Sequence, residues 1–189
     1  MLDEFHWAPS ETSSTLSLIG SHNDVIKTKK HQRWQIEGQI RKINVKSRTW
    51  EGEQTVKIIQ GIQVFMANGE TEAFGMDLHD TVQVDSLEVP DGERIKEFIV
   101  KSGYYIDAIG FKTDKGKTLG LIGGDGGSLK YSSEMLRASD HFYVDGIRGI
   151  TVESLGAPCI CEIQFKNVIS SGLCPIQAIG KSRVTLRYL

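Results

Sequence analysis

The chain has 189 residues and nearly balanced charge, with 22 Lys and Arg against 24 Asp and Glu and a formal net charge of −2. This balance lacks the basic excess that nucleic acids and anionic membranes select, and no apolar run reaches the roughly 18 residues that span a bilayer. A chain of this length can bury a core without the help of a disulfide or a metal ion.

Residues 1–30 differ in composition from the rest of the chain. Ser10 to Ser17 is rich in Ser and Thr, and Lys27 to Lys30 is a short basic run. Neither stretch has a strong period, so we expect a tail, a linker, a late-docking strand or plain disorder. Met1 to Ser10 carries acidic residues and lacks the apolar run of a secretory signal, which predicts a cytoplasmic location.

From about Trp34 onward the sequence predicts β-strands. Short apolar runs alternate with clusters of Gly, Asp, Asn and Ser, and no segment has a sustained apolar stripe of helical period. Ser132 to Ala138 is long enough for only one helical turn. The runs that we expect to be strands include Ile40–Val45, Ile58–Phe65, Glu97–Val100, Ile147–Val152 and Val184–Leu189.

An internal repeat organises this region. Three segments begin with an acidic residue and a glycine, continue through a basic and β-branched run, and end in Ser. Their glycines, Gly38, Gly92 and Gly146, are spaced by 54 residues in each case. A second strand follows in each unit, and in the first two it runs into a turn where Gly69 or Gly116 suits a positive φ. The second strands carry isoleucines that we expect to point inward: Ile62, Ile109 and Ile163.

Each unit is therefore predicted to be an antiparallel sheet of about four strands, used three times. One such sheet has a single apolar face that it cannot bury alone. Three sheets around a common axis would bury all three faces in one core. A sandwich, or a barrel of about six to twelve strands, remains an alternative that the repeat by itself does not exclude.

One stretch of the middle repeat resembles the jacalin-related lectins. Phe98 to Phe111 is similar to the strand pair that carries their sugar site, Lys112 to Gly120 to their next hairpin, and Gly123 to Gly127 to their glycine-rich loop. The resemblance implies an all-β fold, β-prism I, with three Greek-key antiparallel sheets and pseudo-three-fold symmetry. The expected organisation is a tail or linker at residues 1–30 and a jacalin-like domain at residues 31–189.

The resemblance also implies a sugar site in the middle repeat, where a Gly-x-x-x-Asp loop and a Gly-Gly loop belong to one sheet. Asp107 aligns with Gln60 in the first repeat and Cys161 in the third, and neither is a carboxylate, so one site is expected. Galactose-preferring members are processed to free an α-amino group. Because nothing here suggests that processing, a mannose- or glucose-type sugar is expected. The expected sugar-binding residues are Gly103, Tyr104, Tyr105, Ile106, Asp107, Gly123, Gly124, Asp125 and Gly126.

These residue types suit sugar chemistry without reference to the family. The Asp107 carboxylate can accept two hydroxyl donors, and charge-assisted hydrogen bonds are the stronger kind. Glycines let the second loop approach a ligand closely, and Tyr104 and Tyr105 offer an apolar face and a phenol. Two plainer interpretations stay open: Asp107 caps a hairpin, or the glycine loop is an ordinary turn. A phosphate loop is disfavoured because the Lys-Ser/Thr of a P-loop is absent.

Nothing in the sequence predicts catalysis, a metal ion or a cofactor. Cys159 and Cys161 are expected to be buried, inert thiols, and a metal site that includes Cys174 lacks a further ligand nearby. We expect a binding module whose partners are mannose- or glucose-type glycans or a protein, not nucleic acid, with homo-oligomers allowed. The alternative is a protein-interaction or targeting domain that keeps the fold without binding sugar, within a larger intracellular protein that could contain a protease.

Overall fold

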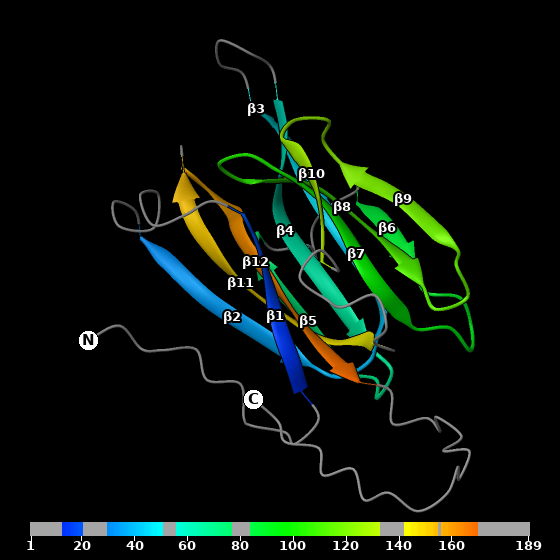
Figure 1. Cartoon of the computed structure of the whole chain (residues 1–189). Coiled ribbons are helices and arrows are strands. Elements are labelled where there is room, and N and C mark those ends of the chain that lie inside the picture. Colours follow the sequence, from blue (N-terminus) through cyan, green and yellow to red (C-terminus); the bar gives the residue numbers. More distant parts are fainter. Residues whose placement is uncertain are drawn as a thin grey trace, which may run out of the picture.

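The computed structural model describes residues 13–20, 30–50, 56–76, 84–132, 142–154 and 156–169. Within these ranges the regular structure consists of β-strands (Figure 1), and no helix there is long and apolar enough to cross a membrane. The strands are β1 (Ser13–Gly20), β2 (His31–Glu37), β3 (Ile40–Trp50), β4 (Val56–Met66), β5 (Thr71–Gly75), β6 (Asp85–Glu88), β7 (Ile95–Ser102), β8 (Ile106–Thr113), β9 (Thr118–Gly123), β10 (Ser128–Tyr131), β11 (Phe142–Ser154) and β12 (Ala157–Ile169).

The strands form three four-stranded antiparallel sheets with one topology. We call them sheet A (β1-β12-β11-β2), sheet B (β5-β4-β3-β6) and sheet C (β10-β7-β8-β9). In sheets B and C the fourth strand of the unit returns beside the first, which is the Greek-key order. Sheet A has the same order when β11 and β12 are followed by β1 and β2, so strands from both halves of the chain close the third key. The predicted all-β fold with three Greek-key sheets is confirmed.

Strand β1 comes from the segment that the sequence leaves open as a tail, a linker or a late-docking strand. It pairs with β12 in antiparallel register, for example Leu18 with Gln164 and Ile19 with Ile163. The strand lies at the edge of sheet A, opposite β2 (Figure 1). Residues before Ser13 lie outside the described part of the chain.

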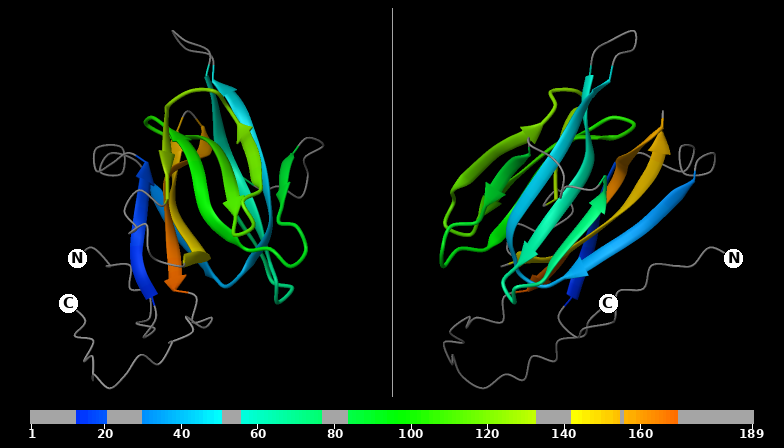
Figure 2. Two further views of the ribbon diagram at one scale, coloured as in Figure 1. Left: turned by 45° about the vertical axis from the view of Figure 1, so that its right-hand side comes forward. Right: turned by 180° about the vertical axis from the view of Figure 1, so that it is seen from behind.

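The three sheets, which Figure 2 shows from two sides, enclose a shared core. The isoleucines predicted to point inward, Ile62, Ile109 and Ile163, are fully buried and belong to one cluster. Phe98 of sheet C contacts sheet A within this core: its ring stacks on Phe165 with centroids 4.1 Å apart. Side chains of all three sheets therefore share one apolar interior, and the prism replaces the sandwich or barrel left open by the repeat.

The strand register also confirms the alignment of the three repeats. In each key a glycine at the end of the third strand pairs with the second strand: Gly20 with Glu162, Gly75 with Gly61, and Gly123 with Ala108. The residues that precede those partners are Cys161, Gln60 and Asp107. The three residues aligned from sequence thus occupy equivalent places in the three sheets, and each is at least 95% buried.

Most of the predicted turns and strands are found, with one shift. Gly69 and Gly116 have φ of 90° and 82°, as expected for the hairpin turns. Gly146 was expected at the start of its strand, but β11 already begins at Phe142, and Gly146 lies where its register with β12 shifts. The strand predicted at Val184–Leu189, and the helical turn at Ser132–Ala138 beyond its first residue, lie outside the described residues.

Candidate functional site

The two loops expected to form a site lie at one end of sheet C. Residues 103–105 connect β7 to β8, and residues 124–127 connect β9 to β10. Figure 1 shows both connections at the upper end of the sheet, near the ends of β3 and β4. They are in contact: a Cβ added at Gly103 would lie 3.9 Å from Gly127 Cα. The two loops, which the resemblance assigns to one sheet, therefore lie side by side.

The carboxylate of Asp107, the second residue of β8, faces the backbone of the glycine loop. Gly103 N donates a hydrogen bond of 3.0 Å to Asp107 Oδ2. A Cβ added at Gly126 would lie 2.9 Å from Oδ1, and one added at Gly127 would overlap Oδ2. Any residue with a side chain at either position would have to displace the carboxylate or the loop. The glycines thus allow an acidic group and a bare backbone to lie side by side.

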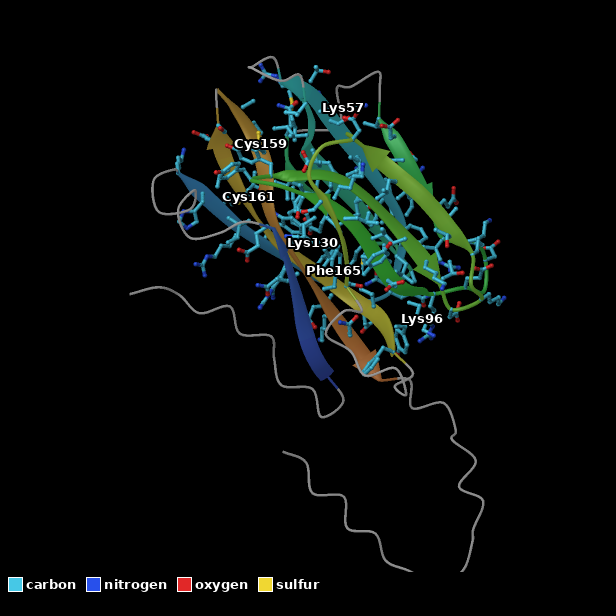
Figure 3. The ribbon with its side chains drawn as sticks, turned by 45° about the horizontal axis from the view of Figure 1, so that its top comes forward. Lys57, Lys96, Lys130, Cys159, Cys161 and Phe165 are labelled. Atoms are coloured by element: carbon cyan, nitrogen blue, oxygen red, sulfur yellow. The ribbon has the colours of Figure 1, made fainter. Side chains whose placement is uncertain are left out.

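Gly124 anchors the same loop on two strands. Its N–H donates to the backbone oxygen of Asp107 at 2.7 Å. A Cβ at this position would overlap the carbonyl oxygen of Lys57 in β4. Figure 3 labels Lys57 near the end of sheet B at which the loop sits. Sequence reasoning missed the contribution of sheet B, because nothing in the repeat indicates how closely two sheets approach.

Asp107 is buried, since only 5% of the residue is exposed. Burial raises the pKa of its carboxyl to about 6, against an ordinary value of 3.8; the Gly103 hydrogen bond and Lys101 lower the pKa, and Asp125 raises it. Lys101 Nζ also donates to the backbone oxygen of Asp125 at 2.9 Å. The carboxylate is therefore mainly charged at neutral pH, and it lies in an environment that disfavours that charge.

The two tyrosines of the Gly103–Asp107 loop have different surroundings. Tyr104 is 75% exposed and can offer its ring to a ligand. Tyr105 is half-buried; its ring packs on the apolar cluster of sheet A, and its hydroxyl lies 2.8 Å from Ser154 Oγ. Ile106 is fully buried and has no exposed surface to offer a ligand. Of the two tyrosines, Tyr104 is therefore the one whose ring is open to solvent.

The cysteines offer no metal centre in the part of the chain that the structure describes. Cys159 and Cys161 are buried thiols, as predicted, and Cys161 Sγ lies 3.4 Å from the backbone oxygen of Ile150. No group of three or more His, Cys, Asp or Glu among the described residues could hold a metal ion. Cys174 lies outside those residues.

Comparison with known proteins identifies the fold and not a close relative. No family model and no curated protein matches the sequence. Solved structures do match it: wild-type Malaysian banana lectin at 15% identity and a TM-score of 0.54, covering 80% of this chain and 95% of the lectin, and Calystegia sepium agglutinin at 16% and 0.54, covering 83% and 97%. The fold is the β-prism of the jacalin-related lectins.

The β-prism also matches part of longer chains. Lamprey immune protein is 18% identical with a TM-score of 0.56, and the match covers 82% of this chain but 44% of that one. PirB is 18% identical with a TM-score of 0.52, and the match covers 70% of this chain and 29% of PirB. The chain thus spans less than half the length of these two proteins. At such identities the likeness establishes the fold, and the function has to be argued from the site.

Proposed function

We propose that this β-prism is a non-catalytic carbohydrate-binding module with one site for mannose- or glucose-type sugars. The site is formed by the Gly103–Asp107 loop and by residues 123–127. The observation that carries the proposal is the position of the Asp107 carboxylate, whose oxygens face Gly126 and Gly127 so closely that no side chain would fit between them.

The arrangement has the three elements that a neutral sugar needs. The Asp107 carboxylate, one oxygen of which already accepts the Gly103 N–H, would accept a hydrogen bond from a sugar hydroxyl, and such a bond to a charged group is stronger than a neutral one. A loop of glycines brings backbone groups close to the ligand. The exposed ring of Tyr104 can pack on the C–H face of a pyranose. Because such a site is small, we expect a dissociation constant on the order of 10 µM to 1 mM.

Two further observations support this function and its sugar class. Structures with the same fold include lectins, and one of them, Calsepa lectin, was solved in complex with a biantennary N-glycan. Galactose preference in the jacalin-related lectins depends on processing that frees an α-amino group, and the present sequence shows no sign of it. Mannose- and glucose-type sugars are therefore favoured.

The test is a titration of the folded protein with methyl α-mannoside, methyl α-glucoside and methyl α-galactoside, by calorimetry or by NMR. We expect binding of the first two, and a loss of at least about 10-fold in Asp107→Asn, because a charged acceptor is lost. Gln60→Ala is the matched control, since Gln60 occupies the equivalent position in sheet B. If wild type binds none of the sugars at millimolar concentration, or binds them as well after Asp107→Asn, the proposal is wrong.

A second candidate is a protein-interaction or targeting domain that has lost sugar binding. It is favoured by the 5% exposure of Asp107 and the Gly103 hydrogen bond that its carboxylate already accepts. The partial match to lamprey immune protein and PirB is consistent with such a module in a longer chain. A protein complex that persists in excess methyl α-mannoside, together with a null sugar titration, would favour this candidate.

A further inference from the structure

We propose that Tyr105 is a positioning residue of the sugar site, which holds the Gly103–Asp107 loop in place by anchoring it to sheet A. The inference rests on the proposed function. It adds a contact between two sheets, since Tyr105 lies in a loop of sheet C and its anchor, Ser154, lies in sheet A. Tyr105 would thus act through the loop rather than by contact with the sugar.

The anchor has a polar and an apolar part. The Tyr105 hydroxyl lies 2.8 Å from Ser154 Oγ, at the end of β11 and 49 residues further along the chain. The ring packs on the small cluster of Ile150, Val152 and Cys161, which is separate from the main core. Figure 3 labels Cys161 on β12, on the sheet-A side of the molecule. The contact therefore ties the tip of the β7–β8 connection to a neighbouring sheet.

Cys161 helps to keep the cluster on which the Tyr105 ring packs apolar. It is the sheet-A counterpart of Asp107, as the register of β12 shows. A carboxylate at that position would place a charge in the cluster on which the Tyr105 ring packs, where burying it without a partner would be costly. A thiol is small and apolar enough to belong to that cluster. Because Cys161 is not a carboxylate, sheet A lacks a site of this kind. The same residue belongs to the cluster that supports Tyr105 and, through it, the loop of sheet C.

The anchor is connected to the Asp107 carboxylate through one backbone group. The N–H of Gly103 lies 3.0 Å from the backbone oxygen of Tyr105 and 3.0 Å from Asp107 Oδ2. A shift of Tyr105 therefore changes the donor that the carboxylate depends on. Gly127 also lies close to Oδ2, since a Cβ added there would overlap that oxygen.

This connection makes the titration of Asp107 a direct reporter of the anchor. The groups that act on its carboxyl are Gly103 N–H, Lys101 of β7 and Asp125 of the glycine loop. The substitution Tyr105→Phe keeps the ring and the other charges but removes the hydroxyl. If the loop then loosens, the Gly103 hydrogen bond weakens. The pH midpoint of the Asp107 titration then rises, because that bond favours the charged form of the carboxyl.

The experiment combines sugar titrations with NMR titration of the Asp107 side-chain carboxyl in wild type, Tyr105→Phe, Ser154→Ala and the double variant. We expect each single variant to bind methyl α-mannoside about 3-fold to 10-fold more weakly and to raise the Asp107 midpoint by about half a pH unit. The double variant should be no worse than either single one, since both remove the same contact. Tyr131→Phe, on β10, is the control and should change neither quantity.

The outcomes separate this inference from the proposed function. A wild type that binds sugar, with Tyr105→Phe and Ser154→Ala unchanged in affinity and in the Asp107 midpoint, would overturn the positioning role alone. A wild type that binds no sugar would overturn the proposed function and the positioning role with it. If Tyr105→Phe does not fold, Ser154→Ala decides the question, because it leaves the Tyr105 ring in place.

Discussion

The substitution Asp107→Asn should stabilise the protein at neutral pH while it weakens sugar binding. The carboxyl has a pKa of about 6 in the folded chain and an ordinary value of 3.8, so between these pH values the folded state binds more protons than the unfolded state. Stability is therefore lost as pH rises through this window, and the whole loss is present above pH 6. The difference corresponds to about 3 kcal/mol. Asparagine has nearly the same shape, carries no charge and can still accept the Gly103 N–H.

We expect a gain of about 2 kcal/mol at pH 7.5, which is a rise in Tm of roughly 4–8 °C for a chain of this size. At pH 4, where the folded-state carboxyl is protonated, the two proteins should have nearly the same Tm. Thermal unfolding followed by circular dichroism at both pH values measures this directly. Asp114→Asn, in an exposed turn at the other end of the sheet, is the control and should change stability by less than about 0.5 kcal/mol. An Asp107→Asn variant that is less stable than wild type at pH 7.5 would refute the reasoning.

Two further predictions concern the glycine loop and the core. Gly124→Ala should abolish sugar binding, because its methyl group would overlap the Lys57 carbonyl. Gly120→Ala, on β9 and with nothing within 4 Å of the new methyl, is the control and should keep binding. Sugar titrations of the two variants check this, and equal binding would contradict the tight fit at Gly124. Ile109→Ala should cost about 2–5 kcal/mol of unfolding free energy in urea and Leu121→Ala, 40% exposed on the same sheet, less than about 1; equal losses would mean that Ile109 is not in the core.

The architecture could be predicted because the information for it is local and repeated. Gly38 and Gly92, 54 residues apart, lie between strands, and the inward isoleucine of each second strand reports the buried face of its sheet. The hairpin turns need a positive φ, and glycine marks the residues that adopt it, Gly69 and Gly116. Three copies of one half-covered sheet leave few ways to bury all the apolar faces.

Contacts between sheets could not be predicted in this way. The approach of Gly124 to Lys57 and the Tyr105–Ser154 contact join different repeats, and they depend on how far each strand extends and how the sheets tilt. The sequence also left open whether Ser13–Gly20 forms a strand, because the segment is rich in small polar residues. Its place in the sheet depends on the edge of β12 that β11 leaves unpaired. The depth of Asp107 has the same origin: the sequence shows the loop that carries it but not the glycine backbone that covers it.

The equivalent positions in the other two sheets indicate whether the fold needs a carboxylate at Asp107. Gln60 and Cys161 fill the same place in sheets B and A and are as deeply buried, yet neither carries a charge. A neutral side chain therefore satisfies the fold at this position, and the carboxylate of sheet C is not required for packing. A charged group that is held where burial opposes it, beside a loop of glycines, is the pattern that functional sites show when stability is given up for binding. Structural capping alone would not explain it, because asparagine could cap the same loop without the cost of burying a charge.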